Sequence, residues 1–467
     1  MISAARRCWH PRRVAGVAAA TTLMALGGGI AFGTPAGAAP VTVNVTNNHD
    51  SGAGSLRAAL VGATGTTIVN VQAGLGTITL SSPIVFPTAD SVFLTLHGNG
   101  ITINANGKTS ALVSNSSSFS FDGFTVTGVG GSANTDAGGI VAFDGSLAVS
   151  NCNLHGNAIH ASGHDAGAIL SEGGPLSVSS CTFTGNTLRT DGERGDAGVI
   201  LAEGNTLNAS GCTVSSNTIA GTGDAATILS EGAELTVASC TFTGNTVQPN
   251  GHGGDAGVIV SEGRTLSASG CTLTSNKTTA AGDGATILSE GGQLLVSTCK
   301  VSANVVTAGG DVAGGADSEG SATTFRNVTD TCNSATSNGG DAAGGLLQEG
   351  GVPTISGSTI VGNTAKSSGD AAVEQQINSR GSAPVISGST VSDNTSICHA
   401  PATTTTTTTT VPVTAASVAP TTVAATAELP RTGGHSSQLG LVGLALVTLG
   451  TACTYAASSK RRRRTSR

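Results

Sequence analysis

The chain is poor in aromatic and charged residues. It has one tryptophan, one tyrosine and ten phenylalanines among 467 residues, and only 10% of its residues are charged. Nucleic-acid binding depends on basic patches and aromatic stacking platforms, so this composition argues against a nucleic-acid partner. Sugar-binding clefts also commonly stack sugar rings on Trp or Tyr, so the scarcity weighs against an enzyme acting on sugars. With 68 glycines, the chain is more typical of a repetitive scaffold.

The chain also lacks the common signatures of catalytic and metal sites. It has no CxxC motif, no phosphate-binding loop and no recognisable Ser/His/Asp arrangement. His155, His160 and His164 lie within ten residues of one another, beside Asp165. Metal binding by these histidines is one interpretation, but we expect them to be solvated side chains near a connector between repeats. We predict no catalytic residue.

The N-terminal segment predicts export. Four arginines precede or begin an Ala-, Gly- and Leu-rich apolar stretch at 14–32, and the small residues Ala36, Gly37 and Ala38 follow it. This order is typical of a secretory signal peptide. We expect residues 1–38 to be removed from the exported protein.

The C-terminal segment carries an LPxTG pattern, followed by an apolar run at 439–457 and a basic run at 460–464. The order resembles the sorting signal, here residues 429–467, of cell-wall-anchored surface proteins of Gram-positive bacteria. The resemblance implies that a sortase cuts before Gly433 and joins Thr432 covalently to peptidoglycan. The residues of the motif are Leu429, Pro430, Arg431, Thr432 and Gly433.

The apolar run determines how the chain would meet the membrane. It is about 19 residues long, barely enough for one transmembrane helix, and the basic run beyond it should stay cytoplasmic. We expect the chain to contact the membrane only transiently and then to reside in the cell wall, on the extracellular face. The alternative is a tail-anchored protein in which the LPxTG pattern is accidental.

Removing both end segments changes the charge. Residues 39–432 contain all 28 acidic residues but only 11 of the 21 basic ones, so the net charge falls from −7 to −17. They contain neither tryptophan nor tyrosine, because Trp9 and Tyr455 lie in the removed ends. We therefore expect an acidic exported protein, which argues further against binding to anionic polymers.

A repeat of about 29 residues fills the middle of the chain. Its five strongest copies share a 22-residue block that begins with an aspartate and is followed by a connector of six or nine residues. Self-similarity at this period is typical of a solenoid. The strong copies begin at Asp165, Asp196, Asp224, Asp255 and Asp283, and weaker copies begin at Asp136, Asp311, Asp341 and Asp370.

The apolar pattern within the block predicts short strands. Ile recurs four residues after the aspartate, Leu eleven residues after it, and further apolar residues follow at a spacing of two. No part of the block has the 3.6-residue period of an amphipathic helix. We predict three strands per repeat and an all-β fold, a right-handed parallel β-helix of about 12 coils over residues 39–399.

Residues 50–60 read DSGAGSLRAAL, and the stretch 41–130 around them resembles the N-terminal coils of bacterial β-helix surface proteins with a pectate-lyase-like solenoid. The resemblance implies a short cap helix over the first coil, which would otherwise expose bare strand edges. The family includes both adhesins and polysaccharide-degrading enzymes.

Stacked repeats place equivalent residues in columns. We expect the asparagine column to form a ladder in which the side-chain amides satisfy one another. We expect the cysteine column to hold buried, inert thiols, because in-register neighbours have parallel Cβ vectors that suit a disulfide poorly. The state of Cys332 and Cys398, outside this column, is left open. The columns are Asn157, Asn186, Asn217, Asn245, Asn276, Asn304, Asn363 and Asn394, and Cys152, Cys181, Cys212, Cys240, Cys271 and Cys299.

Two acidic columns accompany the repeats, and like charges at the coil spacing of about 4.8 Å repel one another. We expect each aspartate to cap its own turn and each glutamate to extend into solvent. The alternative is Ca²⁺ between the columns, since hard oxygen ligands suit that ion; no other cofactor is expected. The candidate ligands are Asp165, Asp196, Asp224, Asp255, Glu172, Glu203, Glu231 and Glu262.

These features favour display over catalysis. A glycoside hydrolase needs two unlike carboxylates at a defined separation, whereas every repeat offers the same ones. Residues 400–428, with eight consecutive threonines and three prolines, predict an extended stalk. We predict a wall-anchored protein whose rigid β-helix binds a glycan or a protein at the cell surface. A polysaccharide lyase or glycoside hydrolase on the same fold is the alternative.

Overall fold

The computed structural model describes residues 39–86, 92–115, 118–143, 145–162, 164–191, 195–232, 234–249, 254–320, 322–368, 374–380 and 383–392, together with Cys398. The predicted signal peptide, stalk and sorting signal lie outside these residues, as do Asp370 and Asn394.

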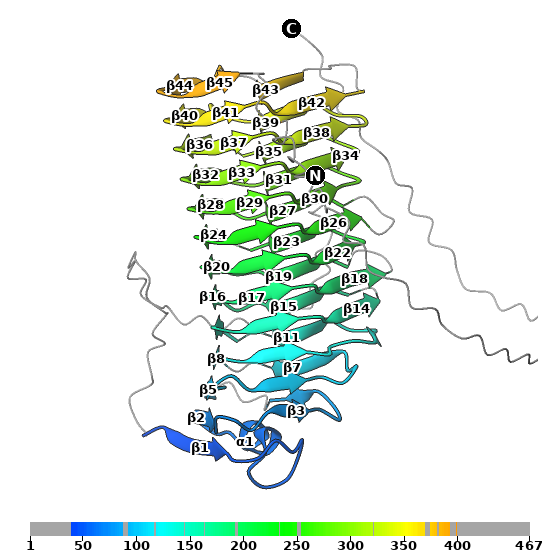
Figure 1. The fold of residues 1–467 in the computed structure, drawn as a ribbon, viewed down its shortest axis with the longest axis vertical. Coiled ribbons are helices and arrows are strands. Elements are labelled where there is room, and N and C mark those ends of the chain that lie inside the picture. Colours follow the sequence, from blue (N-terminus) through cyan, green and yellow to red (C-terminus); the bar gives the residue numbers. More distant parts are fainter. Residues whose placement is uncertain are drawn as a thin grey trace, which may run out of the picture. The chain divides into compact units, whose positions relative to one another are not determined.

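The described residues form a right-handed parallel β-solenoid of about 11 turns (Figure 1). A full turn contributes one strand to each of four parallel sheets, which contain 13, 9, 11 and 12 strands within the described part of the chain. The predicted all-β parallel solenoid is confirmed. The prediction of three strands per repeat is wrong, because each full turn has four.

The strands of the four sheets have the following bounds. The 13-stranded sheet contains β1 (Val41–Val45), β2 (Thr66–Val71), β5 (Phe93–His97), β8 (Ser118–Asp122), β12 (Leu147–Ser150), β16 (Leu176–Ser179), β20 (Leu207–Ser210), β24 (Glu234–Ala238), β28 (Thr265–Ser269), β32 (Gln293–Ser297), β36 (Ala322–Arg326), β40 (Thr354–Ser356) and β44 (Val385–Ser387). The 12-stranded sheet contains β3 (Thr77–Thr79), β6 (Thr102–Asn104), β9 (Thr125–Thr127), β13 (Asn153–His155), β17 (Thr182–Thr184), β21 (Thr213–Ser215), β25 (Thr241–Thr243), β29 (Thr272–Thr274), β33 (Lys300–Ser302), β37 (Thr329–Thr331), β41 (Thr359–Val361) and β45 (Thr390–Ser392). The 11-stranded sheet contains β4 (Ile84–Val85), β7 (Ser110–Asn115), β11 (Ala137–Phe143), β15 (Ala166–Glu172), β19 (Ala197–Glu203), β23 (Ala225–Ser230), β27 (Ala256–Ser261), β31 (Gly284–Ser289), β35 (Val312–Ser318), β39 (Ala342–Gln348) and β43 (Glu374–Ser379). The 9-stranded sheet contains β10 (Ser132–Ala133), β14 (Ala158–Ser162), β18 (Thr187–Asp191), β22 (Thr218–Gly221), β26 (Thr246–Pro249), β30 (Lys277–Thr279), β34 (Val305–Ala308), β38 (Ser334–Ser337) and β42 (Thr364–Ser367).

The fourth strand of each turn lies in the connector between blocks. In β18, Leu188 and Thr190 are buried while Thr187 and Arg189 are exposed, so the connector has the two-residue alternation of a half-buried strand. The connectors differ in length, which is typical of loops, so the sequence did not indicate a strand there. In the structure the extra residues follow the strand and do not interrupt it.

Single residues in the left-handed backbone conformation make the bends on either side of β17. Ser180, with φ of 53°, precedes Cys181, and Gly185, with φ of 63°, precedes Asn186. One such residue redirects the chain without adding a loop. The bend at Ser180 explains why the two-residue period in the sequence breaks just before each cysteine.

The interior of the solenoid is packed by residues stacked in register. Val178 pairs with Ala209 and Phe183 with Val214 in adjacent turns, and all four are at most 1% exposed. Large side chains thus stack on smaller ones. This alternation lets successive turns approach at sheet spacing while the interior remains filled.

A short helix covers the N-terminal end, as the family resemblance implied (Figure 1). Helix α1 (Leu56–Val61) begins after Ser55, whose Oγ accepts a hydrogen bond from the Ala58 amide, and it buries Leu56 and Leu60. Arg57 donates to Asp50 and to the Ser82 carbonyl, which ties the cap to the first turns. Within the described part of the chain, no helix is long and apolar enough to cross a membrane.

Candidate functional site

Two columns of carboxyl side chains begin and end the long strands of the 11-stranded sheet, and we call them together the acidic seam. Eight aspartates immediately precede these strands, and seven glutamates end or follow them. The seam consists of Asp136, Asp165, Asp196, Asp224, Asp255, Asp283, Asp311 and Asp341, and of Glu172, Glu203, Glu231, Glu262, Glu290, Glu319 and Glu349.

The aspartates form a ladder with the backbone. The Oδ1 atom of Asp165 accepts a hydrogen bond from the Asp196 amide at 2.7 Å, and Asp196 accepts one from Asp224 at the same distance. The contact recurs from Asp136 to Asp341 at 2.6–3.1 Å. The expectation that each aspartate caps its own turn is therefore wrong, since it serves the following turn.

The glutamates bond to the aspartates of the preceding turn. Glu203 pairs with Asp165, and Glu231 pairs with Asp196. The same pairing joins Glu290 to Asp255, Glu319 to Asp283 and Glu349 to Asp311. The expectation that the glutamates extend into solvent is wrong for Glu203, Glu231, Glu290 and Glu349, which are half-buried against the aspartates, whereas Glu319 is exposed.

The outward face of the 11-stranded sheet, beneath the acidic seam, is buried as well. Ile169 belongs to the main core, whereas its neighbour Leu170 belongs to a second apolar cluster on the opposite face of β15. Leu201, Leu229 and Leu288 continue this second cluster, and all are fully buried. The sequence carried the signal, because an unbroken apolar run such as Ala-Ile-Leu is typical of a strand buried on both faces.

Burial also determines which carboxyl groups of the seam are protonated. Loss of solvation, followed by the neighbouring carboxylates, raises the pKa of Glu203 and Glu231 far above the ordinary range. The same causes raise the pKa of Glu290 to about 10. Burial also raises the pKa of Asp165, and it raises that of Asp255 to about 6, while the backbone N–H that each accepts favours the ionised form. In the Glu203–Asp165 and Glu290–Asp255 pairs the glutamate therefore holds the proton and donates to the aspartate.

This geometry does not suit glycoside hydrolysis. The two carboxyl groups of a hydrolase stand roughly 5–9.5 Å apart, with room between them for the sugar and water. In the seam, the paired acid and base are hydrogen-bonded to each other, and all members except the exposed Glu319 are half-buried or buried. The paired groups thus lie closer together than the two carboxyl groups of a hydrolase.

Arg380 closes the C-terminal end of the seam. Its guanidinium group donates to Asp311 at 2.8 Å, to Asp341 at 2.5 Å and to Glu349 at 2.7 Å. The lyase alternative needs a basic residue that abstracts a proton, and Arg380 lies among the seam carboxylates. The side chain is occupied by its three ion pairs, so it is not free to abstract a proton.

The structure brings two groups of the predicted calcium ligands together. In each group the carboxylate oxygens lie within 4.8 Å of one another. One group is Asp165, Asp196 and Glu203, and the other is Asp196, Asp224 and Glu231. The remaining predicted ligands, Asp255, Glu172 and Glu262, belong to the same columns but not to these groups.

The asparagine column is a continuous ladder. Each side-chain amide donates to the Oδ1 atom of the next asparagine, at 2.9–3.2 Å, from Asn157 to Asn363. Asn333, which was not among the predicted members of the column, also belongs to the ladder. Gln376 continues the contacts beyond Asn363.

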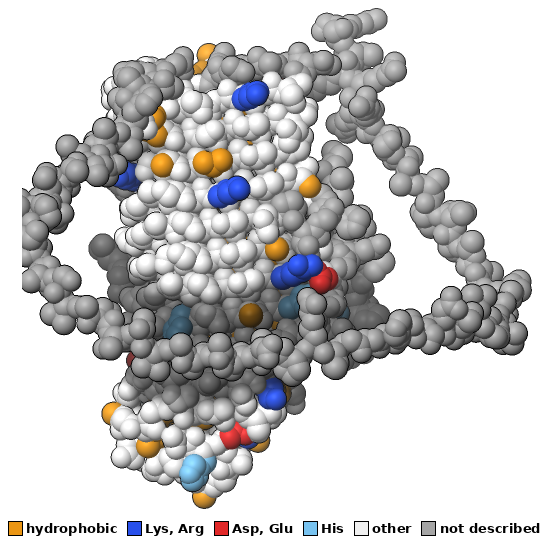
Figure 2. All heavy atoms as spheres, turned by 45° about the vertical axis from the view of Figure 1, so that its right-hand side comes forward, with side chains coloured by type: hydrophobic (Ala, Val, Ile, Leu, Met, Phe, Trp, Pro, Cys, Tyr) orange, Lys and Arg blue, Asp and Glu red, His pale blue; other side chains and the backbone are white. Residues whose placement is uncertain are grey.

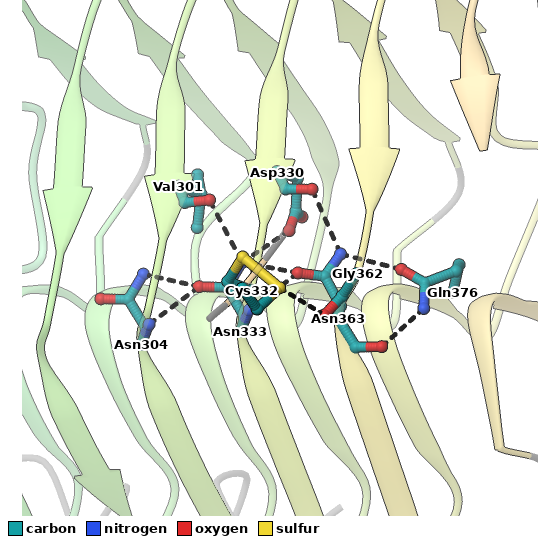
Figure 3. Close-up of a disulfide and its surroundings, with 9 residues drawn as sticks. Val301, Asn304, Asp330, Cys332, Asn333, Gly362, Asn363 and Gln376 are labelled. Carbon is teal, nitrogen blue, oxygen red and sulfur yellow. Dashed lines mark hydrogen bonds between the residues drawn. A yellow bond between two sulfur atoms is a disulfide. The ribbon is translucent and has the colours of Figure 1, made fainter. Parts of the chain in front are cut away.

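A disulfide lies beside the end of this ladder (Figure 3). It joins Cys332, which directly precedes Asn333, to Cys398, 66 residues further along the chain. Closing a loop of this length restricts the unfolded chain and contributes about 4 kcal/mol in the chain-entropy model. The bond thus fastens Cys398 to the turn that contains β37.

The six cysteines of the column are free and buried. Each thiol donates to the backbone carbonyl two residues before it, as Cys181 does to Ser179 at 3.2 Å. We expect none of the six to react with a thiol reagent in the folded protein and all six to react in guanidinium. Rapid labelling of the folded protein, or a mass change on reduction that indicates more than one disulfide, would contradict this prediction.

The three histidines do not form one site. His160 contacts Asp191 at 2.6 Å, and His164 lies 3.7 Å from Asp136. His155 ends β13 with an exposed side chain. Among the described residues, neither group that could hold a metal contains a histidine.

The comparison with protein families agrees with the fold. A family model described as "Right handed beta helix region" matches residues 88–301. No curated protein matches the chain. Among solved structures, the chain is similar to the catalytic unit of a thermostable GH87 alpha-1,3-glucanase from Streptomyces thermodiastaticus strain HF3-3. The identity is 16% and the TM-score 0.27, over 78% of this chain and 71% of that chain.

Proposed function

We propose that this chain is a sortase-anchored cell-wall protein that displays a rigid β-solenoid, with an adhesive or structural role. The observation that carries the proposal is the acidic seam, whose carboxyl groups are engaged with one another and with Arg380. The most obvious catalytic candidates therefore serve the fold. The Cys332–Cys398 disulfide adds support for export, because disulfides persist mainly in oxidising compartments.

The outward faces suit binding because they present the same side chains repeatedly, in register. The face turned forward in Figure 2 carries mostly uncharged polar side chains and backbone, with isolated Lys and Arg side chains. On the 12-stranded sheet, Thr182, Thr213, Thr241 and Thr272 occupy the same register position in four successive strands. Such a surface offers rows of hydroxyl groups to a glycan or protein, and that ligand class is our proposal.

Anchoring is tested with the full chain expressed in a Gram-positive host that has a sortase. The natural sequence should be bound covalently to the wall and released by a muramidase. Thr432→Ala should abolish wall attachment, whereas Thr426→Ala, a change of the same kind in the neighbouring segment, should leave it intact. Equal wall attachment of both variants would overturn the proposed anchor.

Display and catalysis are separated by a second experiment. The released protein is incubated with a panel of polysaccharides and with immobilised glycans and matrix proteins. We expect retention on at least one surface and no new reducing or unsaturated sugar ends. Release of such ends, lost on substitution of a carboxylate, would establish the lyase or hydrolase alternative.

A further inference from the structure

One buried carboxyl group sits beneath the acidic seam without a hydrogen bond. Asp317 in β35 is 1% exposed, and neither of its oxygens has a partner. It pairs in register with Leu288 on one side and Leu347 on the other, so it stands in the apolar column that the seam covers. Ionisation of a carboxyl group among apolar side chains is costly, so burial raises the pKa of Asp317 well above its ordinary range, and either a proton or a bound cation must neutralise the group.

The groups around Asp317 are carboxyls of the seam. Those acting on it are Glu349, Asp283, Asp311 and Glu319. Arg380 is already engaged with Asp311, Asp341 and Glu349. Of the four seam carboxyl groups that act on Asp317, Asp283 and Glu319 therefore have no ion pair with a Lys or Arg side chain within the described part of the chain.

The geometry of the seam suits a hard cation. Ca²⁺ binds six to eight oxygens at 2.3–2.6 Å, so two of its ligands are at most about 5 Å apart. Among the described residues, two groups of the seam already satisfy that limit without an ion, and both lie in turns nearer the N-terminus than Asp317: Asp165, Asp196 and Glu203, and Asp196, Asp224 and Glu231. Asp317 places a further carboxyl group beneath these columns. The neighbouring turns have an apolar residue, Leu288 or Leu347, at the same register position.

We propose that the acidic seam binds a divalent cation of the Ca²⁺ type around Asp317, with Asp283 and Glu319 as its ligands from the seam. The flexible, all-carboxylate donor set favours Ca²⁺ over Mg²⁺, which keeps most of its water. The ion would link two consecutive turns, since Asp283 precedes β31 whereas Asp317 and Glu319 belong to the following turn. This inference concerns the solenoid itself and does not depend on the proposed anchoring or display.

The test measures Ca²⁺ binding to the full chain by calorimetry at neutral pH after removal of metal with a chelator, and the melting temperature with CaCl₂ and with chelator. Wild type should bind Ca²⁺ and melt at a higher temperature in its presence. Asp317→Leu, which restores the residue type of Leu288 and Leu347, should lose at least one ion per chain. It should melt in chelator at or above the wild-type temperature.

Two further variants keep the test decisive. Asp317→Asn should also lose the ion, so the result stands if the leucine variant fails to fold. Asp330→Asn should keep it, because Asp330 is equally buried but belongs to the interior, where it accepts a hydrogen bond from Asn333 at 2.6 Å. Unchanged ion stoichiometry in both Asp317 variants would overturn the proposal, as would a wild-type protein that neither binds Ca²⁺ nor responds to it.

Discussion

Raising the pH from 5 to 8 in the presence of chelator should destabilise the solenoid by several kcal/mol. The folded protein holds protons on seam glutamates whose pKa is raised by burial, while the unfolded chain releases them near pH 4.3. Between these limits the folded state binds more protons, so stability falls as pH rises. Even two retained protons give about 3 kcal/mol per pH unit.

Two glutamates at the C-terminal end of the seam release their protons in the upper part of this pH range. Burial, followed by the neighbouring acids, raises the pKa of Glu319 to about 7 and that of Glu349 to about 8. Their contribution is fully present below about pH 4.3 and is lost progressively as the pH rises towards these values. The decline should therefore become less steep above pH 8, where these two groups have released their protons.

Urea unfolding followed by circular dichroism at pH 5, 6, 7 and 8 measures the effect. Glu231→Gln, which keeps a donor without a titrating proton, should reduce the slope by up to about 1.4 kcal/mol per pH unit. Glu234→Gln, on the exposed end of β24, is the matched control and should leave the slope unchanged. A stability that is flat or rises across this range would contradict the protonated seam.

Breaking the asparagine ladder should be almost as costly. Asn217→Ala removes the acceptor for the Asn186 amide and side chain, and the donors to Phe183 O and Asn245 Oδ1. Each buried group left without a partner costs about 1–3 kcal/mol, so we expect a loss of about 4 kcal/mol.

The control for the ladder is an asparagine of the same turn. Asn208 lies in β20 with an exposed side chain, and Asn208→Ala should change the free energy of unfolding by less than about 0.5 kcal/mol. Equal effects of the two substitutions would show that the ladder contributes nothing beyond an ordinary surface asparagine. An intermediate loss at Asn217 would indicate that water replaces part of the ladder.

Much of the solenoid could be predicted because its repeats are exact in register. The recurrence of Cys181 and Asn186 at fixed distances from Asp165 requires columns, and the columns require stacked turns. The fourth strand escaped prediction because its connector varies in length.

The chemistry of the seam could not be predicted from spacing. Asp165 and Glu203 are 38 positions apart, and a sequence does not show that their side chains meet across a strand. Asp317 was equally hidden, because it lies in a weak copy of the repeat where a carboxylate replaces an apolar residue. Which face that residue occupies depends on the register of β35 against β31 and β39.

The central claim is that the seam glutamates are proton-bearing parts of the fold and not free catalytic acids. Carbon-13 labelling of the glutamate carboxyl groups tests it directly, since the chain has only 11 glutamates and substitutions of Glu203 and Glu231 by glutamine assign their signals. In metal-free protein we predict that both signals keep the chemical shift of a protonated carboxyl group above pH 8. Titration of both near the ordinary glutamate pKa of about 4.3 would contradict the account.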